Sequence, residues 1–181
     1  GTREAAERLA LARERHQAVT IVADYDCDGA TACAVAIRGL GMMGVKADYF
    51  VPHRVHHGYG LSCAVVDLLA ARTPRPDVLL TVDNGVSSAE AVRHAAELGI
   101  DVIVTDHHLP HEVLPKAVAV VDPRRADDTS PFKGLCGAGV AFKLCAALDG
   151  CPPEEMLDYC GDLAAVGTVA DVMPLVGENR T

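Results

Sequence analysis

The chain has 181 residues, half of them hydrophobic, and a formal net charge of −9 at pH 7, which argues against an extensive nucleic-acid-binding face. No apolar run approaches the roughly 18 residues that span a bilayer, and the charged segment 1–16 does not resemble a signal peptide, so neither a membrane protein nor a leader is indicated. The seven cysteines are odd in number and form no C-x-x-C pair, which favours reduced thiols in a cytoplasmic protein over disulfides or a zinc site.

Strand-like and helix-like segments alternate from residue 19 onwards. Short apolar runs rich in β-branched residues predict strands, and the longer segments between them predict helices. The expected strands cover residues 19–23, 46–51, 77–82, 100–105 and 117–121. The expected helices cover residues 30–40, 61–72 and 87–99, and the last of these carries Ser87 and Glu90 at the spacing of a capping box.

This alternation predicts the fold class. Near-continuous apolar strands joined by helices are typical of an α/β fold with a parallel β-sheet and helices on both faces. Past Asp122 the pattern changes, because residues 123–134 are polar and residues 137–150 and 152–172 look helical. We therefore expect one domain over residues 1–181, in which a C-terminal helical segment follows the sheet.

The stretch "DYDCDG", residues 24–29, places three carboxylates on alternating residues and ends in glycine. An EF-hand loop begins in the same way, but it requires a glutamate at its twelfth position, where this chain has Val35. The residues before the stretch read as a strand and not as the entering helix of an EF-hand. A carboxylate-rich turn at a strand end is the better interpretation, and open α/β sheets bind their ligands at such ends.

Three of the predicted strands end in side chains of the kinds that bind divalent metals. Taken alone, Asp83 reads most simply as a cap or turn residue, and paired histidines are usually surface residues. Independent turn residues have no reason to accumulate at three parallel strand ends, so the combination favours a metal site. Carboxylates with imidazoles and no thiolate suit Mn²⁺ or Mg²⁺ better than structural zinc. The candidate ligands are Asp24, Asp26, Asp28, Asp83, His107 and Asp171, with Asp106 and His108 beside them.

Four stretches, "DYDCDG", "VDNG", "TDHH" and "GTVADVMPL", resemble in content and order the motifs of the DHH phosphoesterase superfamily. Three further phrases, "HGYGLS", "GAGVAFKL" and "GTVADVMPLVGENR", are similar to phrases of the RecJ exonucleases within it, and the resemblance covers nearly the whole chain. Two positions depart from the RecJ pattern: Cys27 stands where alanine is usual, and His56 and His57 precede "GYG" where an acidic residue is more usual. Neither departure touches a candidate ligand.

The resemblance implies a function and a set of roles. The implied reaction is two-metal hydrolysis of phosphodiesters. The implied enzyme is a single-stranded-DNA-specific 5′→3′ exonuclease that releases 5′-mononucleotides in DNA repair and recombination. Single-strand-binding protein and a helicase are the candidate partners. Asp26 and Asp83 would hold one ion, with Asp24 as an additional ligand or supporting group. The second ion would lie among Asp28, Asp83, His107 and Asp171, so that Asp83 bridges the two. The implied catalytic residues are His108, Asp106 and Asp83, and the implied substrate-binding residues are His108, Arg54, Gly58, Tyr59 and Gly60.

The resemblance also sets the limits of this interpretation. RecJ exonucleases follow the DHH domain with a DHHA1 domain and often an OB-fold, and the resemblance implies that these parts, with most of the DNA-binding surface, lie outside residues 1–181. A DHH-family oligoribonuclease or cyclic-dinucleotide phosphodiesterase would share every proposed ligand and stays an alternative. An inactive DHH-fold replication scaffold and a metal-binding module without turnover are further alternatives, although here every candidate ligand is present.

Overall fold

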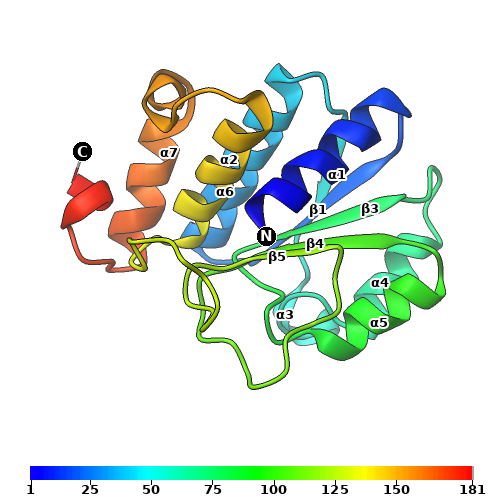
Figure 1. Cartoon of the computed structure of the whole chain (residues 1–181). Coiled ribbons are helices and arrows are strands. Elements are labelled where there is room, and N and C mark those ends of the chain that lie inside the picture. The colour runs from blue at the N-terminus through cyan, green and yellow to red at the C-terminus, as the bar shows by residue number, and fades with distance from the viewer. Residues whose placement is uncertain (181) are drawn as a thin grey trace.

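The computed structural model describes residues 1–180, which form one five-stranded parallel sheet flanked by helices (Figure 1). The sheet has the order β2-β1-β3-β4-β5. Its strands are β1 (Val19–Ala23), β2 (Ala47–Phe50), β3 (Val78–Val82), β4 (Asp101–Thr105) and β5 (Ala119–Val121). The α-helices are α1 (Thr2–Glu14), α2 (Cys27–Met42), α3 (Arg54–His57), α4 (Cys63–Ala70), α5 (Ala89–Glu97), α6 (Gly137–Asp149) and α7 (Leu157–Ala170), and two short 3₁₀ helices are η1 (Pro153–Met156) and η2 (Gly177–Arg180).

Both faces of the sheet are buried except at the edge strand β2, whose residues are half-buried or exposed. Alternate residues of a strand point to opposite faces, and in β3 Leu80 joins the core beneath α1, α2 and α6, whereas Leu79 joins the core beneath α4 and α5. Figure 1 shows α1, α2, α6 and α7 on one side of the sheet and α4 and α5 on the other. The predicted fold class is therefore confirmed, and the two-sided burial explains why the strands are apolar at nearly every position.

The strand order creates a switch point between β1 and β3. From β1 the chain moves through α2 to β2 on one side, and it then returns to place β3 on the other side of β1. In open α/β sheets ligands bind outside the carboxyl ends of the strands at such a point. The topology therefore directs attention to the residues that follow Ala23 and Val82.

Two local expectations need correction. The first connecting helix begins at Cys27 and not near residue 30, because Asp26 accepts a hydrogen bond from the Gly29 N–H and caps α2 three residues earlier than its apolar pattern suggests. The prediction of a capping box formed by Ser87 and Glu90 is wrong. The helix there, α5, begins at Ala89, and its N-cap residue Ser88 makes no side-chain cap hydrogen bond. A turn in which the Ser88 N–H bonds to the Gly85 carbonyl moves the helix start along by one residue. Within residues 1–180 no helix combines the length and apolarity needed to cross a membrane.

Candidate metal centre

The strand register places four acids side by side at one edge of the sheet. Ala23 pairs with Val82, Val82 with Thr105, and Thr105 with Val121. The next residue on each strand is an aspartate, so Asp24, Asp83, Asp106 and Asp122 follow the ends of β1, β3, β4 and β5 in that order. All four side chains are buried. Four adjacent buried carboxylates repel one another unless cations or hydrogen-bond donors compensate them.

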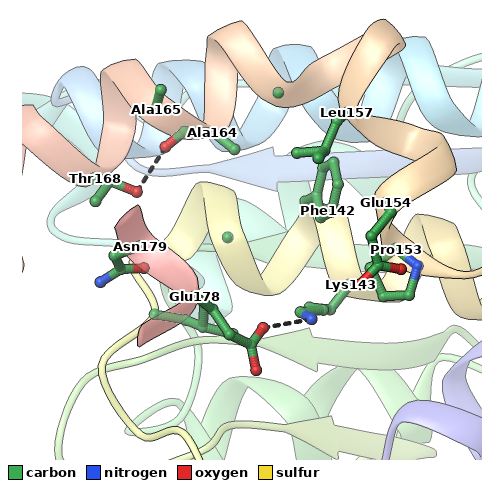
Figure 2. Close-up of a pocket in the computed structure, with 13 residues that line it drawn as sticks. Phe142, Lys143, Pro153, Glu154, Leu157, Ala164, Ala165, Thr168, Glu178 and Asn179 are labelled. Atoms are coloured by element: carbon green, nitrogen blue, oxygen red, sulfur yellow. Dashed lines mark hydrogen bonds and ion pairs between the residues drawn. The ribbon is translucent and has the colours of Figure 1, made fainter. Parts of the chain in front are cut away.

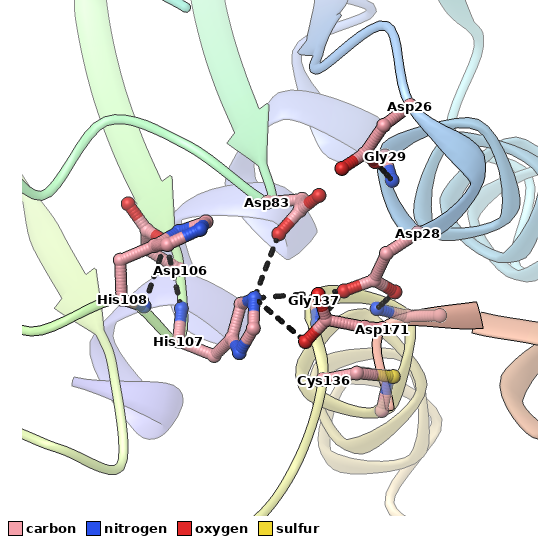
Figure 3. A network of polar contacts seen from close by, with 12 residues as sticks. Asp26, Asp28, Gly29, Asp83, Asp106, His107, His108, Cys136, Gly137 and Asp171 are labelled. Carbon is pink, nitrogen blue, oxygen red and sulfur yellow. Dashed lines mark hydrogen bonds and ion pairs between the residues drawn. The ribbon is translucent and has the colours of Figure 1, made fainter. Parts of the chain in front are cut away.

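Asp83 has an unusual backbone conformation. Its φ angle is +61°, a left-handed value that few residues other than glycine, asparagine and aspartate adopt readily. The following residue, Asn84, fixes this bend by donating its side-chain amide to the carbonyls of Val22 (3.0 Å) and Val82 (2.8 Å). The bend turns the Asp83 carboxylate towards the acids on α2 (Figure 3).

Asp28 lies in the first turn of α2, and the N-terminus of α6 holds it. The N–H of Gly137 donates to Asp28 Oδ2 at 2.6 Å, and the N–H of Ala138 donates to Oδ1 at 2.9 Å. Free N–H groups at a helix N-terminus stabilise an anion. The start of α6 therefore fixes both oxygens of this carboxylate, a role that the sequence did not suggest for residues 137–138.

His107 brings the acids together. Its Nε2 atom lies 3.0 Å from Asp83 Oδ1, 3.6 Å from Asp28 Oδ2 and 3.8 Å from Asp171 Oδ2 (Figure 3). Asp171 comes from the C-terminal end of α7, where the helix dipole disfavours a negative charge. The ring nitrogens of His107 and Asp83 Oδ1 are buried, and within residues 1–180 none of them has a partner with hydrogen-bonding geometry. Asp83 Oδ1 and His107 Nε2 face the same space as the carboxylates of Asp28 and Asp171, an arrangement that suits the ligands of one cation.

The electrostatics of the group also favour a cation. Burial, followed by the charges of Asp28 and Asp26, raises the pKa of Asp83 to about 9. Burial likewise raises the pKa values of Asp24 and Asp171, and it lowers the pKa of His107. A divalent ion would reverse the upward shifts of the carboxylates, and the lowered pKa of His107 favours the neutral imidazole that binds a metal.

Three sets of ligand atoms lie close enough to share an ion. In each set the atoms are within 4.8 Å of one another: Asp24, Asp26 and Asp83; Asp28, His107 and Asp171; and Asp83, His107 and His108. Asp83 belongs to the first and third sets and also contacts His107 of the second. Oxygen donors with one or two imidazoles fit Mn²⁺ or Mg²⁺, and Cys27 is exposed and belongs to none of the three sets.

Asp106 organises the histidine pair rather than the acids. Its Oδ1 accepts hydrogen bonds from the N–H of His107 (2.8 Å) and from Nδ1 of His108 (2.7 Å), and its Oδ2 accepts the N–H of Val86 (2.9 Å). Burial would raise the pKa of Asp106, but these hydrogen bonds outweigh burial and lower it. The bond from Asp106 raises the pKa of His108 to about 9, so His108 is a half-exposed cation at neutral pH.

The segment expected to bind substrate lies beside the same acids. Gly58 and Gly60 have φ angles of +80° and +60°, and the turn that they form carries Tyr59 to the site. The Tyr59 hydroxyl donates to the Asp83 carbonyl at 3.4 Å, and its ring meets His108 edge-on at 6.4 Å between centroids. The Arg54 guanidinium carbon lies 5.3 Å from the centre of the Tyr25 ring. Tyr25 is the residue between Asp24 and Asp26 in the sequence.

Three glycines are required by the close approach of the acids. A Cβ atom on Gly29 would lie 2.5 Å from the Asp24 carbonyl oxygen, and one on Gly137 would lie 2.5 Å from Asp83 Cβ. A Cβ atom on Gly167 would lie 2.6 Å from Asp28 Oδ1. These glycines occur in the phrases "DYDCDG", "GAGVAFKL" and "GTVADVMPL", so part of each phrase has a steric explanation.

The sequence analysis missed Asp122 as a member of this edge. The signal was available, because an acid directly follows a fifth apolar run. Asp122 Oδ1 accepts the N–H of Arg124 at 2.7 Å, whereas its Oδ2 is buried without a partner among the described residues. Burial raises the pKa of Asp122 to about 6, and the hydrogen bond and the His107 charge oppose that rise only in part.

Asp122→Asn is expected to stabilise the protein above about pH 6. The pKa of this carboxyl is about 6 in the folded protein and about 4 in the unfolded chain. The neutral carboxyl therefore favours the folded state below about pH 4, and this contribution to the free energy of unfolding is lost as the pH rises through about 6. Asparagine does not ionise, so the variant avoids this loss. Its free energy of unfolding should exceed that of wild type by roughly 1 to 3 kcal/mol at pH 8, with little difference near pH 4. Urea unfolding at both pH values measures the difference. A difference of equal size at both pH values would contradict the buried-charge explanation.

Two cavities differ in their relation to this centre. One of about 340 Å³ lies between α6, α7 and the two 3₁₀ helices, with Phe142 and Leu157 in its wall and the Lys143–Glu178 ion pair at its side (Figure 2). None of the acids or histidines of the centre lines it. The other, of about 610 Å³, is lined by Asp106 and His108 and therefore adjoins the centre.

The fold and the site together define an open α/β protein with a candidate divalent-metal site at its switch point. The chain belongs to the DHH family, since the pattern of the DHH family, N-terminal domain, matches residues 18–168. It is 41% identical over 180 residues to the single-stranded-DNA-specific exonuclease RecJ of Bacillus subtilis and 43% identical over 192 residues to that of Escherichia coli. These alignments cover 99% of this chain but only 22% and 33% of the two relatives. A crystal structure of exonuclease RecJ bound to manganese matches with a TM-score of 0.86 and 42% identity, over 99% of this chain and 45% of that one.

Proposed function

We propose that this chain forms the metal centre of an exonuclease that hydrolyses single-stranded DNA with two divalent ions, Mn²⁺ or Mg²⁺. The observation that carries the proposal is the convergence of Asp28, Asp83 and Asp171 on His107 Nε2, from elements that are far apart in the sequence. The relatives that are 41% and 43% identical to this chain are named single-stranded-DNA-specific exonucleases, and one related structure contains manganese.

The proposed ligands divide into two groups around Asp83. Asp26 and Asp83 would hold one ion, supported by Asp24, and Asp28, Asp83, His107 and Asp171 would hold the other. Two ions bound in this way supply a nucleophile from water at neutral pH and neutralise charge on the transferring phosphoryl group.

The other groups would act on the phosphate and the strand. His108 carries a positive charge and uses Nδ1 to bind Asp106, which leaves Nε2 free to donate to a phosphate or leaving-group oxygen. Asp106 fixes the orientation of His108 and so has a supporting role. Arg54, with Tyr59 between Gly58 and Gly60, would contact the incoming strand.

The proposal also extends to the direction of cleavage and the setting. By resemblance, digestion would run 5′→3′ and release 5′-mononucleotides, with single-strand-binding protein and a helicase as candidate partners. A cytoplasmic location would suit the seven cysteines, all of which are free thiols.

A direct test offers the protein two substrates with Mn²⁺: a labelled single-stranded DNA oligonucleotide and a dinucleotide. We expect mononucleotides to be released from the 5′ end of the long strand and EDTA to stop the reaction. Cleavage of the dinucleotide alone would favour an oligonucleotide-degrading phosphodiesterase. Cleavage of neither would favour an inactive scaffold, although such a protein has no need of the aligned acids that are present here.

A further inference from the structure

The larger cavity has a composition that suits a flat, uncharged ring. Its volume is about 610 Å³, within the range of small-ligand sites. Its walls include the apolar side chains of Leu61, Val86 and Ala91 and the ring of Tyr59. Among the described residues that line it there is no lysine or arginine, and the carboxylates of Glu90 and Asp106 outnumber the one cationic side chain, His108. This lining disfavours a phosphate group.

Polar groups for hydrogen bonding stand at one side of the cavity. Ser87 and Ser88 line it at the start of α5, and the Ser88 side chain makes no cap hydrogen bond to that helix. These hydroxyls, together with the Glu90 carboxylate, can meet the donor and acceptor groups on the edge of a nucleobase. The Tyr59 ring is held in place by its bond to the Asp83 carbonyl and offers a face or edge for contact.

The cavity and the metal centre share a wall. Asp106 and His108 line the cavity, and His108 also belongs to one of the metal-binding sets. In a nucleotide one sugar separates the phosphate from the base. A phosphate beside His108 therefore leaves its base within reach of a cavity that begins at the same side chain.

From these observations we propose that the cavity between Tyr59 and α5 binds a nucleobase of one of the two nucleotides that flank the scissile phosphate. The inference rests on the proposed function and names a subsite for it. Stacking of a base on an aromatic side chain accepts every base, because each has a π face, so the subsite would favour strands with a base at that position over abasic ones without strong sequence preference.

The test fills the cavity and removes the base. Cys63 is half-buried, lines the cavity and begins α4, so Cys63→Phe places a ring in that space. Cys63→Ser is the isosteric control, and Leu68→Phe adds the same ring at an exposed position of α4 outside the cavity lining. Each variant is assayed with Mn²⁺ on normal single-stranded DNA and on DNA with an abasic residue at the first or the second nucleotide.

We expect Cys63→Phe to raise the KM for normal DNA roughly 10-fold, whereas both controls resemble wild type. On one of the abasic substrates the KM of wild type should rise by a similar factor. On that substrate Cys63→Phe should raise the KM no further, because the filled cavity and the missing base remove the same interaction. A KM unchanged by Cys63→Phe, or effects that multiply on both abasic substrates, would overturn the proposal. Ser87→Phe, which starts from an exposed position on the cavity lining, repeats the test if Cys63→Phe fails to fold.

A binding measurement separates this proposal from the proposed function. If wild type cleaves DNA and the filled cavity has no effect, only the subsite is wrong. If wild type cleaves nothing, the exonuclease assignment fails, and calorimetric titration with thymidine 5′-monophosphate still tests the cavity: binding about 10-fold weaker in Cys63→Phe than in wild type supports it, and equal binding refutes it. Weakened binding of inorganic phosphate by Cys63→Phe, without an effect of abasic substitution, would assign the cavity to phosphate and overturn the base subsite.

Discussion

Asp83→Asn is expected to lower Mn²⁺-dependent hydrolysis of single-stranded DNA by at least about 1,000-fold while the protein stays folded. Asparagine accepts the φ angle of +61° at this position, so the backbone bend should survive. The amide has no negative charge and cannot serve two ions as the carboxylate would. Single-turnover hydrolysis measures the loss, and circular dichroism checks the fold.

Thermal unfolding provides a second measurement on the same variant. Without metal, Asp83→Asn should be at least as stable as wild type, because it removes a buried carboxylate that lies among other acids. With Mn²⁺, wild type should gain more in melting temperature than the variant. Equal stabilisation of both proteins by Mn²⁺, or retained turnover in the variant, would show that Asp83 does not bind the metal.

Gly167→Ala is expected to weaken Mn²⁺ binding at least about 10-fold, an effect of the size seen when groups that orient a ligand are lost. The added methyl carbon would lie 2.6 Å from Asp28 Oδ1 and 2.7 Å from Thr31 Oγ1, so Asp28 or α7 must move. The same crowding should destabilise the protein by about 1 to 3 kcal/mol. Isothermal titration with Mn²⁺ and urea unfolding measure the two effects.

Gly161→Ala is the matched control, because it lies on the same helix away from the acids. Its added carbon would come no closer than 3.3 Å to a movable Leu157 side chain, and alanine favours a helix over glycine by about 1 kcal/mol. We expect this variant to bind Mn²⁺ normally and to be no less stable than wild type. If both variants lost metal affinity equally, the cause would be a general disturbance of α7 and not contact with Asp28.

The sequence predicted the parts of this protein that depend on local pattern. The apolar runs of five or six residues contain the five strands, because helices cover both faces of the sheet and favour continuous apolar strands. The strand-end acids were predictable for the same reason, since parallel strands finish at one edge. Asp171 was suggested by its charge in an apolar segment, and it does lie against His107.

The sequence did not predict contacts between segments that are distant along the chain. Nothing local indicates that the N–H groups of Gly137 and Ala138 hold Asp28, or that Asn84 ties the ends of β1 and β3. The start of α2 was placed too late because side-chain capping by Asp26 outweighs apolar pattern at a helix end. The cavity beside His108 depends on how α4 and α5 pack, which no single segment encodes.

The placement of Asp28 and Asp171 on α2 and α7 has a consequence for how the protein unfolds. These two helices pack together, and their acids reach one histidine on the loop after β4. An ion bound among them would act as a tether between early and late parts of the chain, and a partly opened form that releases α7 would lose Asp171 as a ligand. Metal should then slow hydrogen exchange in α2 and α7 alike, so that manganese supply would set the lifetime of the folded chain as well as its activity.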